Sequence, residues 1–431
     1  MITATVYPGT PRGTVKIPAS KSLAHRAVIC AALADGESKL TNLTRSNDIN
    51  ATLNGMAALG AQITAVSEDE VIITGQGRPA ASAPLTVDCG ESGSTLRFFI
   101  PIFALTGQKV RFICHGRLPQ RPQSVYQQIF AEQGLHFAPF ADAEGAGWEL
   151  QGSLQPGDFT LAGDVSSQFI SGLLFALPLL GGDSTIHIQP PFESRSYVEL
   201  TLATLRNFGV TAHWQDDFTL LIPGGQQYRA CAQQIEGDFS QLAFWAALGA
   251  INSEVTLCGI NHNSAQGDRQ IIEIIRQMQG EIEDTADGYI CRPGRLQAAA
   301  VDLADCPDLG PILTVLAALA KGETRLYNAG RLRIKESDRI ADVECELARF
   351  GIRTHSTQDE LFISGGNADL AADSPCQAHN DHRIVMALSV LATVCSRPTV
   401  IHNAEAINKS YPNFFQNLQN LGIKVELTNV E

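Results

Sequence analysis

Lys21, Ser22 and Arg26 lie in one short segment, from residue 18 to residue 26, at the predicted start of a helix. Arg26 follows Ser22 by four residues, so the two side chains share a helix face. An ammonium, a hydroxyl and a guanidinium together suit a phosphate or a carboxylate. An N-capped helix with a solvated basic face is the simpler alternative. A Ser–Lys hydrolase pair would also need an oxyanion loop, and none is visible nearby.

Two further segments combine small residues with arginine. Residues 90–97 place Gly93 before Arg97, and small residues let the backbone approach a ligand closely. The spacing is neither that of a nucleophile elbow nor that of a phosphate loop. Arg117 and Arg121 flank prolines in a predicted loop, for which a plain surface turn is the alternative.

Hydroxyl and amide groups dominate a third pair of segments. Ser166, Ser167 and Gln168 open one predicted helix, and Ser194 and Tyr197 open the next. These groups suit a polyhydroxylated or phosphorylated ring, although helix capping alone also accounts for serine pairs.

The C-terminal half carries denser charge. Lys335, Glu336 and Arg339 occupy a strand-to-helix junction in residues 331–339, where they can reach a common point or form a solvated charged face. Residues 380–383, ending in Arg383, lead directly into an apolar helix. Burying such groups without a partner is costly, so this segment indicates a ligand. Lys409 lies in a later polar run.

A sixfold repeat positions these segments. Each repeat has an amphipathic helix that ends at a glycine, and successive glycines are about 71 to 75 residues apart: Gly60, Gly134, Gly209, Gly280, Gly351 and Gly422. Glycine there is typical of a left-handed cap that ends a helix. Each repeat also has a second helix, apolar on all sides and therefore buried, which opens at a polar turn. We predict a unit of strand, buried helix, strand, outer helix, strand and strand, with three units in each of two domains.

Composition excludes several classes. The chain has 431 residues, 44% hydrophobic and 18% charged, and a net charge of −14, which argues against nucleic acid as a partner. No segment reaches the roughly 18 apolar residues of a membrane span, and the first residues lack the pattern of a signal peptide. The ten cysteines include no C-x-x-C pair, so we predict neither a metal site nor disulfides. We expect a cytoplasmic protein.

Three phrases in this order resemble the 5-enolpyruvylshikimate-3-phosphate synthase family. They are P-x-x-K-S-x-x-H-R from Pro18, R-x-K-E-S-D-R from Arg333 and N-D-H-R from Asn380. The resemblance implies an α/β fold of two domains, each of three βαβαββ units with buried helices, an inside-out α/β barrel. It implies domains of residues 1–17 plus 237–431 and 18–236, with the active site in the cleft between them.

The resemblance also implies an activity and residue roles. The family transfers the enolpyruvyl group of phosphoenolpyruvate to the 5-hydroxyl of shikimate 3-phosphate and releases phosphate, without a cofactor or metal, and we expect a monomer. Catalysis would fall to Asp308, Glu336 and Lys21. Shikimate 3-phosphate would be bound by Lys21, Ser22, Arg26, Ser166, Ser167, Gln168, Ser194, Tyr197, Asp308 and Lys335. Phosphoenolpyruvate would be bound by Lys21, Gly93, Arg121, Gln168, Arg339, Arg383 and Lys409.

The chain departs from the family pattern at two places. Residues 91–98 differ from the common N-A-G-T-A-M-R-P, and Arg331 stands where an asparagine is widespread. Two alternatives remain. A UDP-N-acetylglucosamine enolpyruvyl transferase shares the fold but lacks the K-E-S-D-R phrase and commonly uses a loop cysteine. A non-catalytic repeat protein that binds anions would need no paired carboxylates at Asp308 and Glu336.

Overall fold

The computed structural model describes residues 1–367 and 369–429, and the chain folds into two compact units. Unit 1 comprises Met1–Ser20 and Glu236–Glu431, and unit 2 comprises Lys21–Ile235. The chain therefore starts in unit 1, builds unit 2 without interruption, and returns. The sequence-based bounds placed the two crossings at residues 17/18 and 236/237.

Unit 2 contains three sheets of the same design. In each sheet, one parallel pair of strands is extended by two antiparallel strands. The strand orders are β14(Tyr228–Arg229)–β3(Ala34–Thr41)–β5(Val71–Gln76)–β4(Gln62–Ala65), β6(Leu85–Asp88)–β7(Val110–Cys114)–β9(Gly145–Gln151)–β8(His136–Asp142), and β10(Asp158–Ala162)–β11(Ser184–Gln189)–β13(Thr219–Ile222)–β12(His213–Trp214), and β15(Ala232–Gln234) also pairs with β3.

Unit 1 repeats this design with strands from both ends of the chain. The antiparallel partners of β1(Ile2–Val6) are β24(Thr399–His402) and β25(Val425–Asn429), and β23(Cys376–Gln377) runs parallel to β24. A second sheet has the order β17(Glu281–Thr285)–β18(Gly288–Arg292)–β16(Val255–Cys258)–β2(Gly13–Lys16). The third has the order β19(Ala300–Asp302)–β20(Glu323–Tyr327)–β22(Leu361–Ser364)–β21(Thr354–Ser356).

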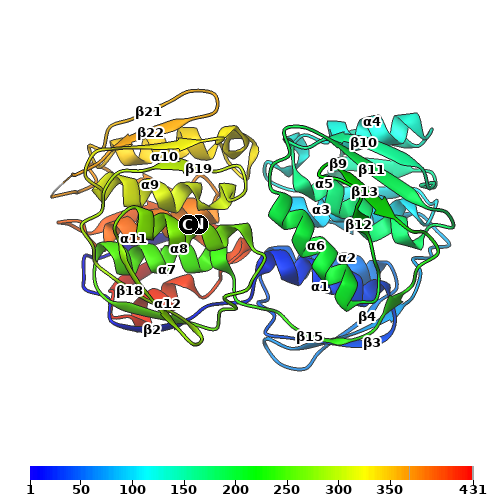
Figure 1. The fold of residues 1–431 in the computed structure, drawn as a ribbon, viewed down its shortest axis with the longest axis horizontal. Coiled ribbons are helices and arrows are strands. Elements are labelled where there is room, and N and C mark those ends of the chain that lie inside the picture. Colours follow the sequence, from blue (N-terminus) through cyan, green and yellow to red (C-terminus); the bar gives the residue numbers. More distant parts are fainter. Residues whose placement is uncertain (368, 430–431) are drawn as a thin grey trace. The chain divides into compact units, whose positions relative to one another are not determined.

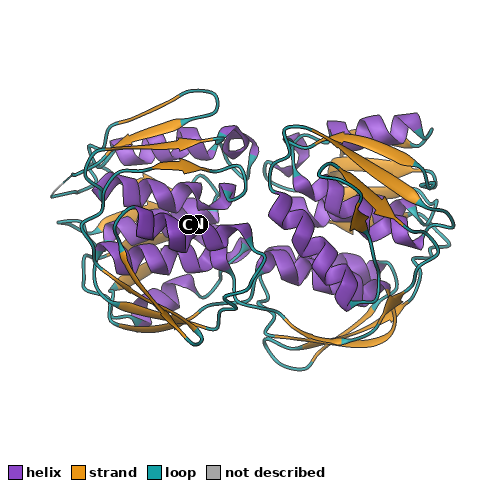
Figure 2. Cartoon of the chain, in the orientation of Figure 1, coloured by secondary structure: helices purple, strands orange, loops and turns teal. Residues whose placement is uncertain are grey.

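In each unit the helices lie inside and the strands lie outside (Figure 1). Figure 2 shows the same arrangement coloured by secondary structure. The α-helices of unit 2 are α1(Lys21–Leu33), α2(Asn47–Ala58), α3(Gly93–Ala104), α4(Ser124–Glu132), α5(Ser167–Ala176) and α6(Arg195–Asn207), with the 3₁₀ turns η1(Leu118–Gln120) and η2(Leu177–Leu179). Those of unit 1 are α7(Phe239–Ile251), α8(Gln270–Gln277), α9(Gly310–Leu319), α10(Arg339–Ala348), α11(His382–Ala392) and α12(Phe414–Asn420), with the turns η3(Gly267–Arg269), η4(Pro307–Leu309), η5(Gly330–Ile334) and η6(Ala404–Lys409). The predicted inside-out α/β fold is confirmed.

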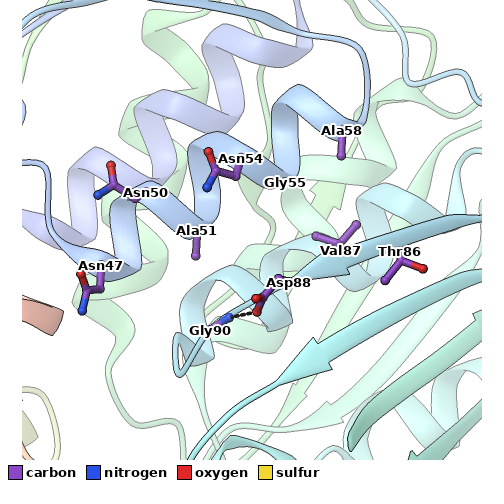
Figure 3. A pocket seen from close by; sticks show the side chains of 10 residues that line it. All are labelled: Asn47, Asn50, Ala51, Asn54, Gly55, Ala58, Thr86, Val87, Asp88 and Gly90. Carbon is purple, nitrogen blue, oxygen red and sulfur yellow. Dashed lines mark hydrogen bonds between the residues drawn. The ribbon is translucent and has the colours of Figure 1, made fainter. Parts of the chain in front are cut away.

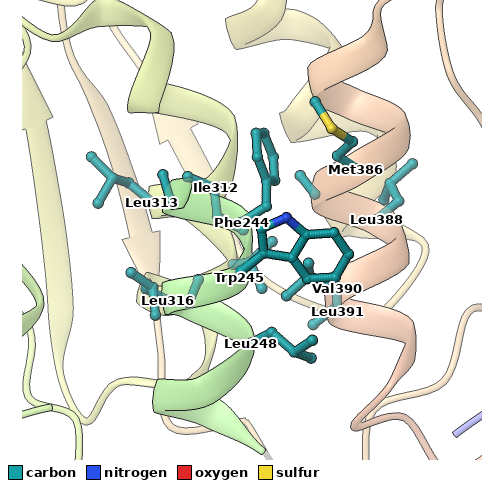
Figure 4. Close-up of a cluster of buried hydrophobic side chains, with 14 of the residues drawn as sticks. Phe244, Trp245, Leu248, Ile312, Leu313, Leu316, Met386, Leu388, Val390 and Leu391 are labelled. Atoms are coloured by element: carbon teal, nitrogen blue, oxygen red, sulfur yellow. The ribbon is translucent and has the colours of Figure 1, made fainter. Parts of the chain in front are cut away.

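The innermost helices are those that the sequence predicted to be apolar on all sides. Every residue of α11 is buried, and all of α7 except Ile251 is buried. In unit 1 their side chains meet those of α9, with Trp245, Ile312 and Leu391 among them (Figure 4). Because this packing fixes the three helices side by side, it also fixes where their N-terminal ends lie.

Five of the six repeat glycines end their helices in the left-handed conformation, with Gly60, for example, at φ +105°. The exception is Gly280, where positive φ falls on the preceding residue, Gln279, at 65°. At position 280 the constraint is space, because an added Cβ would lie 2.4 Å from Cγ2 of Ile275. The repeat therefore keeps a glycine there for close packing rather than for its backbone angle.

Candidate functional site

The N-terminal ends of the inner helices of unit 1 carry a compact set of charges. We call Asp308, Lys335, Glu336, Arg339, Asp381 and Arg383 the Asp308 cluster. They come from η4, the η5–α10 junction and the start of α11. Asp308 is paired with three cations: Lys335 Nζ at 3.3 Å, Arg339 Nη1 at 2.8 Å and Arg383 Nη2 at 3.0 Å.

Arg339 holds the cluster together. Arg339 is only 1% exposed. Its Nε donates to Asp381 Oδ2 at 2.7 Å, and its Nη2 donates to Glu336 Oε2 at 2.9 Å. Burial works against the charged form of Arg339, but the three carboxylates around it outweigh burial and raise its pKa. Arg339 is therefore a permanent positive charge whose own side chain is almost completely buried.

The cations also set the protonation of Asp308. Burial alone would raise the pKa of this carboxyl, yet the charges of Arg383, Lys335 and Arg339 hold it well below its usual value. Burial lowers the pKa of Lys335, partly offset by the charge of Asp308. With its three cations in place, Asp308 is thus firmly ionised and a weak base.

Asp381 fixes the start of the helix from which the Arg383 side chain extends. It caps α11 by accepting from the backbone N–H of Arg383 at 2.8 Å while also binding Arg339. The guanidinium of Arg383 then reaches back to both the backbone oxygen (3.2 Å) and the carboxylate (3.0 Å) of Asp308. Just before this helix, Lys409 Nζ donates to the backbone oxygen of Asn380 at 2.6 Å. The predicted residues of unit 1 therefore lie together.

Arg331, which departs from the family pattern, donates to the backbone oxygen of Ala304 at 2.7 Å. The bond joins the η5 turn to the loop before η4. In this structure Arg331 thus supports the backbone near Asp308.

Unit 2 carries its own polar set at the starts of α1, α3 and α5. Lys21, the first residue of α1, forms an ion pair with Asp48 Oδ2 of α2 at 2.9 Å. Gln168 of α5 accepts from Arg97 Nη1 at 2.8 Å and donates to Ser94 Oγ at 2.9 Å. Gln168 therefore ties the start of α5 to that of α3, and the capping bond from its backbone N–H to Ser166 Oγ fixes its helix.

Gly93 and Arg121 lie in direct contact. A Cβ added at Gly93 would lie 2.6 Å from Nη1 of Arg121. Arg121 is buried, at 9% exposure, at the end of the η1 turn. The glycine is therefore required for the guanidinium to rest on the opening of α3, an explanation that the sequence alone did not give.

Arg26 and Tyr197 meet inside unit 2. Arg26 donates to Thr201 Oγ1 at 2.8 Å and to the backbone oxygens of Ser22 (2.7 Å) and Tyr197 (2.9 Å). Burial lowers the pKa of Arg26 to about 10, which still leaves it charged at neutral pH. Arg26 thus ties α1 to α6, whose first turn follows Ser194, a residue in the left-handed conformation.

The sequence analysis does not identify two acids of these sets. It assigns no role to Asp48, and it includes Asp381 only as part of a charged segment. Asp381 offered a signal, since an acid directly before an apolar helix is a typical N-cap. Asp48 offered none, because its partner Lys21 lies 27 positions away in the chain.

Unit 2 also has a groove that is lined by other residues. Figure 3 shows it between α2 and β6, lined by residues that include Asn47, Asn50, Asn54, Thr86 and Asp88. None of the residues predicted to bind substrate lines it. Among the described residues, no helix is long and apolar enough to cross a membrane, and no group of three His, Cys, Asp or Glu side chains is arranged to hold a metal.

Comparison with known proteins decides the family. The family model for EPSP synthase (3-phosphoshikimate 1-carboxyvinyltransferase) matches residues 7–418. This chain belongs to the EPSP synthase family. A 3-phosphoshikimate 1-carboxyvinyltransferase of Clostridium perfringens is 42% identical over 418 residues, which cover 97% of each chain. One from Clostridioides difficile is 38% identical and covers 99% of this chain and 98% of its own.

Solved structures agree with this assignment to the EPSP synthase family. EPSP synthase from Acinetobacter baumannii matches with a TM-score of 0.80 at 25% identity, covering 100% of both chains. The enolpyruvyl transferase NikO from Streptomyces tendae matches with a TM-score of 0.77 at 17% identity, covering 100% of this chain and 99% of its own, and shows that the fold is shared.

Proposed function

We propose that this chain transfers the enolpyruvyl group of phosphoenolpyruvate to the 5-hydroxyl of shikimate 3-phosphate and releases phosphate. The observation that carries this proposal is the Asp308 cluster, in which one ionised carboxylate is shared by three cations beside a second carboxylate, Glu336. Anion binding needs the cations, and acid–base chemistry needs the carboxylates. A protein that only bound anions would gain nothing from carboxylates that compete with its ligand.

The cations of both units would bind the two anionic substrates. Phosphoenolpyruvate would be held by Arg339, Arg383 and Lys409 of unit 1 and by Lys21, Gly93, Arg121 and Gln168 of unit 2. Shikimate 3-phosphate would be held by Lys21, Ser22, Arg26, Ser166, Ser167, Gln168, Ser194 and Tyr197 of unit 2 and by Asp308 and Lys335 of unit 1. For Arg26, the substrate would replace one of its present acceptors.

Substrate binding would turn Asp308 into an effective base. Without substrate, its three cations hold the pKa of Asp308 well below its usual value, after outweighing the opposing effect of burial. A phosphate or carboxylate that pairs with Arg339 and Arg383 neutralises their attraction for Asp308, so the pKa of Asp308 rises when both substrates are present. The site would therefore gain its base only when there is a proton to accept.

The reaction would then proceed by addition and elimination. Asp308 accepts the proton of the 5-hydroxyl while the hydroxyl oxygen bonds to the central carbon of phosphoenolpyruvate. The methylene carbon gains a proton through Glu336 or Lys21, which gives a tetrahedral intermediate. The C–O bond to phosphate then breaks, and the phosphate leaves with the proton that Asp308 had accepted. The methyl group returns one proton to Glu336 or Lys21, and the enol ether forms. Arg339, Arg383 and Lys21 stabilise the charge that builds on the phosphate oxygens.

Phosphate release tests the proposal. Wild-type enzyme should release phosphate from phosphoenolpyruvate with shikimate 3-phosphate and not with UDP-N-acetylglucosamine as acceptor. Asp308→Asn keeps the shape but removes the proton acceptor, so kcat should fall by roughly 10² or more. Asp287→Asn, at an exposed turn between β17 and β18, is the matched control. Phosphate release only with the UDP-sugar, or normal turnover by Asp308→Asn, would refute the proposal.

The proposal also includes a monomeric enzyme in the cytoplasm, where the cysteines, which form no disulfide among the described residues, would stay reduced. Analytical ultracentrifugation at assay concentrations would check the monomer. A dimer that loses activity when it is diluted apart would contradict it.

A further inference from the structure

Asp268 is a buried acid that the reaction scheme leaves without a role. It lies in the η3 turn, directly before α8, and is 2% exposed. Its Oδ2 accepts a hydrogen bond from Ser240 Oγ in the first turn of α7. Its Oδ1 is buried and, among the residues that the structure describes, has no hydrogen-bond partner. No cation in that same part of the chain forms an ion pair with it, so its charged form would be poorly stabilised.

The groups around Asp268 belong to the proposed anion site or adjoin it. The η3 turn packs against α7 and η4. The charges of Asp238, the cap of α7, and of Asp308 in η4 act on Asp268, and the charge of Asp268 acts on Cys306. Arg383 of α11 is the cation whose charge reaches it. On its own side, Arg269 is directed to the backbone oxygen of His262. Among the acids of α8, Glu273 pairs with Arg276 at the surface.

Among these neighbours, the two acids Asp268 and Asp308 differ in protonation state. Burial, and then the charges of Asp308 and Asp238, raise the pKa of Asp268 to about 7 against the opposing effects of Arg383 and Ser240. Asp308 keeps its charge because it holds three cations at ion-pair distance. When two carboxyl groups compete for the same positive charge, their pKa values move apart, so that one group is ionised while the other keeps its proton.

We propose that Asp268 is a positioning residue for the anion site: with its proton it leaves the charge of Arg383 available to an anionic substrate, and without its proton it weakens that binding. Asp268 acts through Arg383 and Asp308 and does not itself touch substrate. The inference rests on the proposed function, since it assumes that Arg383 binds phosphoenolpyruvate.

Thermodynamic linkage between anion binding and proton binding predicts a second measurable effect of Asp268. If loss of the Asp268 proton weakens anion binding, then anion binding must strengthen the hold of Asp268 on its proton. Above about pH 7, where Asp268 is partly ionised, an anion that binds beside Arg383 should therefore draw a proton from solvent. Well below that pH the carboxyl is already protonated, and no uptake is expected from it.

The test compares wild type with Asp268→Asn, which mimics the neutral acid. With saturating shikimate 3-phosphate, the KM for phosphoenolpyruvate should be similar in both proteins near pH 6. Near pH 8.5 the wild-type KM should exceed that of the variant by about three- to tenfold, as expected for one added charge near the site. Asp287→Asn should follow wild type throughout. A ratio that does not change with pH would overturn the proposal.

Calorimetry measures the number of protons taken up when an anion binds. Titration of inorganic phosphate near pH 8 in buffers of different ionisation heat should show proton uptake by wild type that Asp268→Asn lacks. This measurement does not require turnover, so an enzyme without the proposed activity would still test Asp268. Conversely, active wild type with equal proton uptake in both proteins would refute only the role of Asp268.

Ser240→Ala covers the case in which Asp268→Asn fails to fold. It keeps the carboxyl and removes the hydrogen bond that favours its ionised form. The pH at which the KM for phosphoenolpyruvate begins to rise should therefore move upward in this variant. A profile that coincides with that of wild type would contradict the proposal.

Discussion

Arg383 illustrates why the type of cation matters in this site. Its guanidinium contacts both the backbone oxygen and the carboxylate of Asp308 through different nitrogens, and the residue is only 4% exposed. Its position is therefore fixed before any ligand arrives. A lysine could supply the charge at one of these acceptors but could not present a planar pair of donors to a substrate.

Arg383→Lys should weaken phosphoenolpyruvate binding by about 1.5 to 3 kcal/mol, the range typical of charged hydrogen bonds. The binding of shikimate 3-phosphate alone should change little, since we propose that it depends mainly on unit 2. Calorimetry with each ligand measures both. The matched control is Arg325→Lys, whose guanidinium pairs with Glu360 at the surface. If the variant bound shikimate 3-phosphate more weakly and phosphoenolpyruvate as tightly as wild type, the assignment of the two substrates to the two polar sets would be reversed.

Gly93→Ala should displace Arg121 without disturbing the fold. The new Cβ would lie 2.6 Å from Nη1, and only the mobile end of the arginine has to move. We expect the KM for phosphoenolpyruvate to rise by about tenfold, equivalent to roughly 1.4 kcal/mol, with little change for shikimate 3-phosphate. Gly181→Ala, where an added Cβ meets no atom within 4 Å, is the control. An unchanged KM would mean that Arg121 does not bind this substrate.

Asp308 should also stabilise unit 1 in a pH-dependent way. Its folded-state pKa is lowered by Arg383, Lys335 and Arg339 despite burial. Its contribution is therefore complete above about pH 4, the ordinary pKa of the carboxyl, and is lost as the pH falls through the lowered value. Asp308→Asn should destabilise the protein by the order of 3 kcal/mol at pH 7. Urea unfolding at pH 7 and at about pH 3 should show wild type and variant converging in acid; a constant difference would contradict this.

Among the elements, the inner helices of unit 2 are joined by a chain of hydroxyls. His25 Nδ1 contacts Thr52 Oγ1 at 2.7 Å, Thr52 contacts Thr95 Oγ1 at 2.7 Å, and Thr95 donates to Ser92 Oγ at 2.7 Å. The chain runs from α1 through α2 to the cap of α3. Burial, with the nearby charges of Lys21 and Arg26, lowers the pKa of His25 well below its usual value, so His25 is neutral.

Thr52→Val keeps the shape of the side chain but breaks this chain of hydroxyls. The buried ring nitrogen of His25 would lose its partner, which typically costs about 1 to 3 kcal/mol. We expect that loss in the denaturant unfolding of unit 2, with unit 1 unaffected. Thr64→Val, on the exposed side of β4, should cost much less. Equal effects of the two substitutions would show that the hydroxyl chain does not stabilise the protein.

The positions of the inner helices could be predicted because their sequences are locally distinctive. Each combines a polar opening with an all-apolar body, and α11 begins at His382, inside the segment 380–383 from which the sequence predicts an apolar helix to start. The pairs that aim the side chains could not be predicted. Lys21 meets Asp48, and Arg383 meets Asp308, only after separate segments of the chain have packed together. Asp268 was missed for the same reason, because its neighbours come from three other helix openings.

At the scale of the whole molecule, the two units differ in how their sheets are closed. The sheets of unit 2 are built from residues 21–235 alone. Unit 1 needs the N-terminal strands, since β1 lies between β24 and β25 and β2 is the parallel partner of β16. A central strand cannot be lost without unpairing the backbone on both sides.

Deleting residues 1–18 should therefore unfold unit 1 and leave unit 2 folded. Hydrogen exchange followed by mass spectrometry should show lost protection in β24, β25 and β16 and normal protection in β7 and β11. A separate fragment of residues 21–235 should fold on its own and match the exchange pattern of unit 2 in the full chain. Retained protection in β24 after the deletion would refute the assignment of β1 as an essential strand.

The pairing of Ile2 with Asn429 has a consequence for synthesis on the ribosome. Unit 2 can complete its sheets once residue 235 has emerged, while translation continues. β1 must instead wait until its neighbours β24 and β25 have been added, at a rate of about 5 to 20 residues per second. During that wait, β1 would present unpaired edges to solvent although unit 2 is already folded. During synthesis unit 2 can thus complete its sheets early, whereas unit 1 completes the sheet that contains β1 only after β24 and β25 have emerged.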